Sequence, residues 1–339
     1  MQPMNRVLLA AAAVWISVAA PVNAETPIKF SLDWKYEGTQ APFLLGLDKG
    51  YFKAEGLDVT VDTSGGSVEP INRIASGTYD MAFADINSMI KFRDQNPQIA
   101  LKAVYMVYSN PPFAIVGRKS RGISDPKSLE GKKLGAPAPD GAYAQWPIFV
   151  EANGIDASKV SIMNVGFPVR EPMLVAGDVD AITGFSFSSY INVKYSGVPQ
   201  DDIVVMLMSN YGLKLYGNAI LVNPKFAAEK PDAVKAFLRA FNHAMKDTIK
   251  TPQEAIASVL KRNEVAKGNV ELDRLELALR DNIVTPEVKA NGLGGVDMDR
   301  LDKSIDQIAV TYKFKGEKPK SSDIFDPAFL PPAAERKLN

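Results

Sequence analysis

Residues 69–85 read EPINRIASGTYDMAFAD, and residues 171–186 read EPMLVAGDVDAITGFS. Each stretch follows a glycine turn and an earlier matching segment, KAEGLDVTV at 53–61 and EANGIDASKVSIMNV at 151–165. Both copies give the same order: helix end, Gly-[Leu/Ile]-Asp, β-branched strand, glycine turn, helix opened by Glu-Pro, Gly-x-x-Asp and a short apolar strand. The repeated order indicates a duplicated structural unit.

Glycine and proline predict where the helices of this unit begin and end. Pro70 and Pro172 suit the first turn of a helix. Four glycines suit the left-handed position that closes a helix: Gly56, Gly77, Gly154 and Gly177. Strands at 81–84 and 181–185 follow, so strands and helices alternate as in a parallel sheet. The sequence therefore predicts an α/β fold with two similar lobes.

The first 24 residues have the pattern of a cleavable secretory signal. Arg6 is their only charge, a short apolar run at 7–20 follows it, and Val22-Asn23-Ala24 offers a small-residue cleavage site. A membrane anchor would need about 20 strongly apolar residues. The chain has no cysteine to carry a lipid, so we expect an unanchored protein of the periplasm.

Composition excludes some classes of partner and of chemistry. The 339 residues are 46% apolar and carry 39 basic and 39 acidic side chains. Without Arg6 the mature chain has 38 basic against 39 acidic residues, a net charge of −1. There is no basic stripe with interleaved aromatic residues, so we expect no nucleic acid partner.

Breaks in the pattern place the lobe boundaries. Pro111-Pro112 separates the first α/β unit from the second, and YGNAILVNP at 216–224 starts a return to the first lobe. We expect a first lobe at 25–112 and 216–339, with a second lobe at 113–215. The last part is mainly helical to residue 313, and 231–249 has an apolar stripe of a core helix.

In parallel sheets, ligands bind beyond the carboxyl ends of the strands. The stretch DWKYEGTQ at 33–40 follows the first predicted strand, and this loop position favours a ligand contact for Trp34 over a role in covering the core of its lobe. TSGGS at 63–67 precedes a helix whose free N–H groups could hold a polar or anionic group, or it is an ordinary turn. The first lobe and the hinge thus offer these candidates: Trp34, Tyr36, Gln40, Ser64, Gly65, Ser67, Asp85, Asn87 and Asn110.

The second lobe offers a matching set. PAPDGAYAQW at 137–146 follows the strand at 134–136, and its polar residues cluster where a helix starts. Two aromatic residues at and beyond the repeated strand could form the far wall. The candidates of this lobe are Asp140, Tyr143, Gln145, Phe185 and Tyr190.

Signals for catalysis or for a metal are almost absent. The chain lacks cysteine, phosphate-loop and nucleophile-elbow motifs, and its single histidine, His243, lies away from the apolar stripe of its helix. The pair Asp178/Asp180 belongs to the repeated turn, and Asp297/Asp299 precedes a charged helix. We therefore expect no catalytic residue, no metal and no cofactor.

Several stretches together resemble a known family. LDW, KGYFKAEGLDV, SGTYDMAFAD, SDPKSLEGKKLGAP and GDVDAITGF, within residues 26–250, are similar to the periplasmic solute-binding proteins of ABC importers, in the nitrate/taurine/sulfonate group that includes pyrimidine-precursor (thiamine-biosynthesis-like) binders. The resemblance implies a type II-like two-lobed fold whose hinge strands would be 113–117 and 217–222. It also implies a monomer that closes around one small molecule and delivers it to a permease with its ATPase subunit.

The ligand class follows from the candidate residues, which are aromatic, amide and acidic, with Arg170 as the one arginine near a strand end. We expect an aromatic or heteroaromatic molecule such as a pyrimidine. A sulfonate, nitrate or aromatic carboxylate is the alternative ligand. A periplasmic ligand-sensing module and, more weakly, a pyrimidine-synthesis-like enzyme are the alternative functions. In place of the Asn and His that follow the tryptophan in pyrimidine-precursor binders, this chain has Tyr36, Glu37 and Gly38. Eukaryotic relatives that make a pyrimidine use a His and iron-binding Cys residues beside the site, which this chain lacks there.

Overall fold

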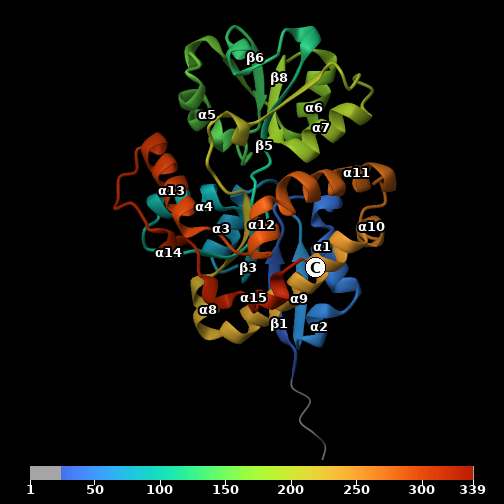
Figure 1. Ribbon diagram of the computed structural model, residues 1–339, viewed down its shortest axis with the longest axis vertical. Coiled ribbons are helices and arrows are strands. Elements are labelled where there is room, and N and C mark those ends of the chain that lie inside the picture. The colour runs from blue at the N-terminus through green and yellow to red at the C-terminus, as the bar shows by residue number, and fades with distance from the viewer. Residues whose placement is uncertain (1–23, 339) are drawn as a thin grey trace, which may run out of the picture.

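The computed structural model describes residues 24–338, and the chain forms two lobes, each built around one five-stranded sheet (Figure 1). The predicted signal peptide lies outside the described residues, apart from Ala24. The first sheet runs in the order β2 (Leu57–Asp62), β1 (Thr26–Ser31), β3 (Met81–Asp85), β10 (Asn218–Val222) and β4 (Lys102–Met106). The second runs β7 (Ser161–Asn164), β6 (Lys133–Ala136), β8 (Ala181–Phe185), β5 (Phe113–Arg118) and β9 (Ile203–Leu207).

The two sheets have the same plan. In each, three strands are parallel, β2-β1-β3 and β7-β6-β8. The fourth strand is antiparallel to both of its neighbours, β10 in the first sheet and β5 in the second. The predicted α/β fold with two similar lobes is confirmed.

Helices cover both faces of the first sheet. Strand β3 is buried throughout, and its side chains alternate between two cores. Met81 and Phe83 share a core with α1 (Ala41–Asp48) and α9 (Pro231–Lys250). Ala82 and Ala84 face α3 (Val68–Ala75) and α4 (Ile86–Gln95). A continuous apolar run therefore marks a strand that is covered on both sides.

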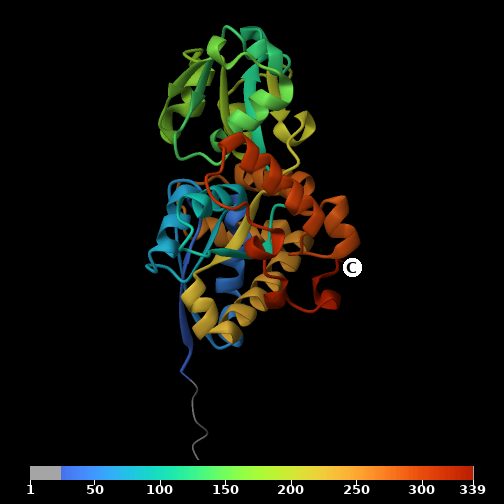
Figure 2. The ribbon, with the colours of Figure 1, turned by 90° about the vertical axis from the view of Figure 1, so that its left-hand side faces the viewer.

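The helical C-terminal part packs on the first lobe and also reaches the second (Figures 1 and 2). The predicted stripe of α9 is buried, and its Phe237 and Phe241 stack on Phe30 of β1 and Phe43 of α1 with ring centroids 5.0 and 4.4 Å apart. Two of these helices contact helices of the second lobe, α11 (Gly268–Ala278) on α7 (Ser186–Tyr195) and α13 (Met298–Tyr312) on α5 (Trp146–Asn153). The remaining elements are α2 (Tyr51–Ala54), α6 (Phe167–Ala176), α8 (Pro224–Glu229), α10 (Pro252–Leu260), α12 (Pro286–Asn291), α14 (Ser321–Ile324) and α15 (Ala333–Arg336).

The predicted starts and ends of the repeated helices are confirmed with one exception. The four repeated glycines, Gly56, Gly77, Gly154 and Gly177, all have positive φ. Pro70 lies in the first turn of α3, but Pro172 lies inside α6. The prediction for Pro172 was wrong because α6 begins earlier, at Phe167, and Pro168 takes the first-turn position.

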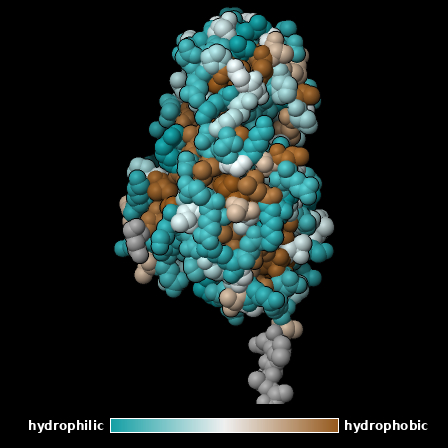
Figure 3. Space-filling model, turned by 90° about the vertical axis from the view of Figure 1, so that its right-hand side faces the viewer, coloured by the Kyte–Doolittle hydropathy of each residue, from teal (hydrophilic) through white to brown (hydrophobic). Residues whose placement is uncertain are grey.

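The chain crosses between the lobes just before β5 and just before β10, at residues 107–112 and 208–217. The strands expected to form the hinge do not cross themselves, because β5 is fully paired in the second sheet and β10 in the first. Figure 3 shows apolar surface gathered at the waist where the lobes meet. Among the residues that the structure describes, no helix is both long and apolar enough to span a membrane.

Candidate functional site

A cleft between the lobes is lined by loops that follow the strands of both sheets. The first lobe contributes Asp33, Trp34, Thr39, Gln40, Gly66 and Ser67, and the second contributes Asp140, Gly141, Phe167, Arg170, Phe185, Phe187 and Ser188. These residues come after β1, β2, β6, β7 and β8, so the cleft lies at the carboxyl ends of the parallel strands of both lobes. The free space between them is about 40 Å³, on a scale where about 10–15 Å³ holds one water molecule. The lobes are therefore nearly closed on each other.

Aromatic rings from the two lobes meet across this cleft. Trp34 of the first lobe and Phe167 of the second pack edge to face, with ring centroids 4.6 Å apart and an interplanar angle of 70°. Phe185 and Phe187 form a second edge-to-face pair at 5.7 Å. The Nε1 donor of Trp34 is buried and has no hydrogen-bond partner within the described part of the chain. The cleft thus offers apolar ring faces and one indole N–H for a ligand.

Asp33 is the buried carboxyl on the first-lobe side of the cleft. Its Oδ1 accepts a hydrogen bond from Gln40 Nε2 at 3.2 Å, and its Oδ2 accepts one from Asn218 Nδ2 at 2.6 Å. Burial raises the pKa of Asp33 from 3.8 to about 7, although both amide donors act in the opposite direction. A carboxyl that titrates near neutral pH can accept hydrogen bonds or, once protonated, donate one.

Arg170 is the cation on the second-lobe side, and two carboxyls neutralise it. Its Nε and Nη2 donate to Glu171 Oε1 at 3.0 and 2.6 Å, and its Nη1 lies 3.7 Å from Asp140 Oδ2. Thr183 also donates to Asp140 Oδ2. Burial raises the pKa of Asp140, whereas the nearby Arg170 opposes that rise. The positive charge is thus already paired inside the protein.

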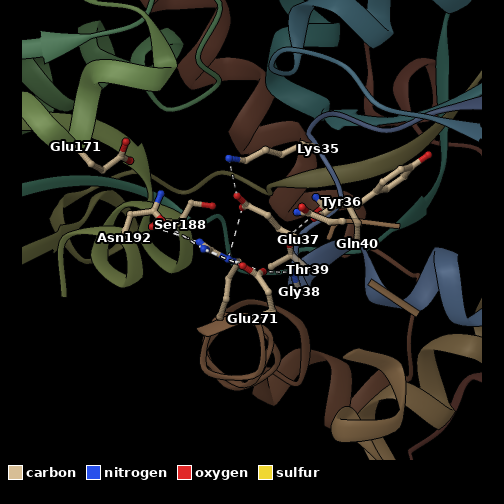
Figure 4. Close-up of polar contacts among 12 residues, drawn as sticks. Lys35, Tyr36, Glu37, Gly38, Thr39, Gln40, Glu171, Ser188, Asn192 and Glu271 are labelled. Atoms are coloured by element: carbon tan, nitrogen blue, oxygen red, sulfur yellow. Dashed lines mark hydrogen bonds and ion pairs between the residues drawn. The ribbon is translucent and has the colours of Figure 1, made fainter. Parts of the chain in front are cut away.

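The cleft brings together some of the residues expected from the sequence. Those that line it are Trp34, Gln40, Ser67, Asp140 and Phe185. Tyr36 points away from it, because its hydroxyl donates to the Val61 carbonyl at 2.8 Å (Figure 4). Ser64 and Gly65 form the turn before α3, and the Gly65 N–H donates to Glu69 Oε2 at 2.7 Å instead of facing a ligand.

Asp85, Asn87 and Gln145 lie together between the lobes, but they do not line the cleft. Asp85 caps α4 by accepting the backbone N–H groups of Asn87 and Ser88. Gln145 Nε2 reaches it from the second lobe at 3.3 Å. Burial raises the pKa of Asp85 to about 6. The strand-end carboxylate of Asp85 therefore caps the helix that follows it. Its position in the sequence alone does not distinguish this role from ligand binding.

The other three expected residues also lie outside the cleft. Asn110 lies in the first crossing segment and donates to the Asp281 carbonyl at 2.9 Å. Tyr143 lines a separate groove that also includes Tyr312, and Tyr190 lines another that includes Lys194.

Sequence reasoning left out part of the cleft: Asp33, Thr39, Gly66, Gly141, Phe167, Arg170, Phe187 and Ser188. Asp33 lies two residues after the end of β1, and Phe167, the first residue of α6, takes the position that corresponds to the Gly65-Gly66 turn in the repeat. Phe167 could have been found by aligning the two copies, and Asp33 by its place in the strand-end stretch at 33–40. Phe187 and Ser188 lie in the first turn of α7. Whether a residue there lines the cleft depends on the direction of its side chain, which the sequence does not give.

The described residues contain no cluster of three or more side chains suited to a metal ion. His243 is exposed and stacks on Tyr51 with a centroid distance of 4.1 Å, as expected for a histidine outside the core. Among the described side chains, the cleft therefore has no histidine base or thiolate.

The two lobes and the cleft between them have the architecture of the periplasmic-binding-protein fold. Among solved structures, the periplasmic aliphatic sulphonate binding protein SsuA from Escherichia coli is similar, with a TM-score of 0.69, 13% identity, and coverage of 92% of this chain and 97% of that one.

The chain belongs to the NMT1/THI5-like family, whose model matches residues 38–255. A formylaminopyrimidine-binding protein of Halalkalibacterium halodurans is 26% identical over 295 residues, which cover 85% of this chain and 86% of that protein. A 4-amino-5-hydroxymethyl-2-methylpyrimidine phosphate synthase of Schizosaccharomyces pombe is 25% identical over 66% of each chain.

Proposed function

We propose that this protein is the periplasmic solute-binding component of an ABC importer and that its ligand is an aminopyrimidine-like heteroaromatic molecule. The observation that carries the proposal is the pairing of aromatic ring faces with the buried carboxyl of Asp33 in one cleft. Aromatic faces stack on a planar ring. A carboxyl can hydrogen-bond an exocyclic amino group and, when protonated, also a neighbouring ring nitrogen.

Charge argues against a simple oxyanion as the ligand. Asp33 and Asp140 face the cleft, and Arg170 is already bound by Glu171 and Asp140. A nitrate or sulfonate would have to compete with these carboxylates for the guanidinium. A neutral or protonated ring with amino donors meets no such competition.

The relatives support the same reading. The bacterial relative is named for binding a formylaminopyrimidine, and the similar solved structure is a periplasmic binding protein. We therefore assign this chain to the periplasm as a monomer that delivers its ligand to a permease and its ATPase subunit. The lobes would comprise 25–112 with 216–339, and 113–215.

A synthase activity is the alternative that the yeast relative raises. The chain has no cysteine, and its one histidine, His243, stacks on Tyr51 at the surface of α9 rather than lining the cleft. We propose that the protein binds its ligand without converting it.

Isothermal titration of residues 25–339 tests the ligand class. The probes are 4-amino-5-hydroxymethyl-2-methylpyrimidine, its N-formyl analogue, riboflavin, an alkanesulfonate and nitrate. We expect a pyrimidine to bind, and we expect Trp34→Ala to weaken that binding about tenfold or more, because a ring face is lost.

The matched control is Tyr36→Phe, since that ring lies in the same loop but its hydroxyl bonds Val61 outside the cleft. It should leave the affinity within about twofold of the wild type. Binding of the sulfonate or nitrate alone, with no effect of Trp34→Ala, would overturn the aromatic assignment.

A further inference from the structure

Arg274 of α11 is a buried cation that bonds to both lobes. Only 2% of its surface is exposed. On the first-lobe side, its Nε lies 3.0 Å from Glu271 Oε2 and 3.5 Å from Glu37 Oε2. On the second-lobe side, its Nη1 donates to the carbonyls of Phe187 and Ser188 at 3.3 and 3.4 Å, and its Nη2 donates to Asn192 Oδ1 at 3.0 Å (Figure 4).

The first-lobe partners of Arg274 hold the loop that shapes the cleft. Glu271 Oε2 accepts the Gly38 N–H at 2.6 Å. A Cβ atom at Gly38 would lie 2.1 Å from the Glu271 carbonyl oxygen, so the loop packs directly on α11. Thr39 and Gln40, the next two residues, line the cleft.

The second-lobe partners belong to the cleft as well. Phe187 and Ser188 both line it, and both lie in the first turn of α7. Arg274 therefore connects one wall of the cleft to the other through hydrogen bonds that form only when α7 lies against α11. A guanidinium suits this task because its planar fork can bond several oxygens at once.

We propose that Arg274 is a positioning residue that latches the two lobes in the arrangement that encloses the ligand. This inference rests on the proposed function, because it assumes that the protein works by opening and closing its cleft. When the lobes part, Arg274 stays bonded to Glu37 and Glu271. Its three hydrogen bonds to the Phe187 and Ser188 carbonyls and to Asn192 are replaced by hydrogen bonds to water. The latch thus favours closure without touching the ligand.

A nearby pair of contacts gives a matched comparison. Asp273, the residue before Arg274, accepts from Lys194 Nζ and the Tyr195 hydroxyl of α7, both at 2.8 Å. These bonds also join α11 to α7, but their side chains are partly exposed and belong to no wall of the cleft. Partly exposed ion pairs contribute little, so this pair should not control closure.

The test measures the distance between the lobes. The native chain has no cysteine, so spin labels on Asp58→Cys and Ala157→Cys, both at exposed positions of different lobes, report one distance. The distribution is recorded without ligand and with 4-amino-5-hydroxymethyl-2-methylpyrimidine. We expect Arg274→Gln to lower the ratio of closed to open molecules about tenfold or more, and Arg274→Lys to restore part of it.

Two further variants test the latch without leaving a buried carboxylate unpaired by the loss of Arg274. Asn192→Ala removes one second-lobe acceptor and leaves the buried carboxylates paired, so it should shift the ratio about twofold to fivefold in the same direction. Asp273→Asn should leave it within about twofold. Distributions like the wild type in folded Arg274→Gln and Asn192→Ala would overturn the latch. If no pyrimidine binds, the proposed ligand fails, whereas the ligand-free distances still decide the latch.

Discussion

Asp33 shows how one residue can combine a structural and a recognition role. It lies two residues after the end of β1, is 5% exposed, and is held by amides from its own loop and from β10. Burial disfavours the charged form more than two hydrogen bonds favour it, so its pKa is raised to about 7. The folded protein therefore retains the proton at pH values where the unfolded chain has lost it.

This difference predicts a pH dependence of stability. The contribution of protonated Asp33 is complete below about pH 4 and is lost as the pH rises through 7. The free energy of unfolding of the wild type, minus that of Asp33→Asn, should fall by about 1–3 kcal/mol between pH 5 and pH 8. Urea unfolding followed by circular dichroism measures both values.

Subtracting the free energy of unfolding of Asp33→Asn from that of the wild type isolates the contribution of the Asp33 carboxyl. Asp85 and Asp140 also have raised pKa values because they are buried, but they titrate in both proteins and cancel. A difference that stays constant across this pH range would show that Asp33 does not titrate there.

At the level of secondary structure, the two copies of the repeat end the helix before their last strand in the same way, with a glycine in the left-handed conformation. Gly77 follows α3 at φ 76°, and Gly177 follows α6 at φ 84°. The surroundings differ, because a Cβ at Gly77 would find only Asn223 Nδ2 at 3.9 Å, whereas at Gly177 it would meet the Arg121 guanidinium carbon at 2.9 Å.

We therefore predict unequal costs for the same substitution. Gly77→Ala should lower the free energy of unfolding by about 1 kcal/mol, the cost of a left-handed alanine. Gly177→Ala should cost a few tenths of a kcal/mol more, since it also displaces Arg121 from Asp180. Urea titrations of both variants measure this.

The Arg121→Ala background serves as the control. There, Gly177→Ala should cost the same as Gly77→Ala, because the close neighbour is gone. If the costs of the two substitutions in free energy of unfolding still differ by as much, the backbone rather than Arg121 causes the difference.

At the scale of the whole molecule, Arg300 of α13 ties the two crossing segments together. Its Nη2 donates to the Ser109 carbonyl in one segment at 2.9 Å and to the Leu215 carbonyl in the other at 2.7 Å. Its guanidinium lies over the Tyr216 ring at 3.9 Å and pairs with Glu287. The helical C-terminal part therefore braces the hinge from outside.

Removing this brace should loosen the hinge alone. We predict that Arg300→Gln speeds amide hydrogen exchange in residues 107–110 and 213–217 about tenfold or more, while exchange in β1 and β3 is unchanged. Mass spectrometry of the exchanging protein resolves these segments.

Arg280→Gln is the matched control, since Arg280 is exposed and its one ion pair within residues 24–338 is with the adjacent Asp281. It should leave exchange in the crossing segments unchanged. Faster exchange throughout Arg300→Gln would indicate general unfolding instead of a local brace.

Three features follow from the amino-acid sequence alone: the duplicated α/β plan, the glycine helix ends and the apolar face of α9. These features depend on local propensity and periodicity, which neighbouring residues carry within the chain. The same reasoning placed Trp34, Gln40, Ser67 and Asp140 in strand-end loops and Phe185 at the end of a strand, and all five line the cleft. It misplaced the start of α6, because two prolines, Pro168 and Pro172, offered the same signal.

The bonds that the strand-end side chains make depend on how the two lobes pack. Asp85 and the Gly65 N–H have ligand-binding positions, yet they bond to their own helix and to Glu69. Arg274 gave no signal because its partners Glu37 and Asn192 lie far from it in sequence. Side-chain direction and long-range pairing depend on how the two lobes pack, and no local pattern records that packing.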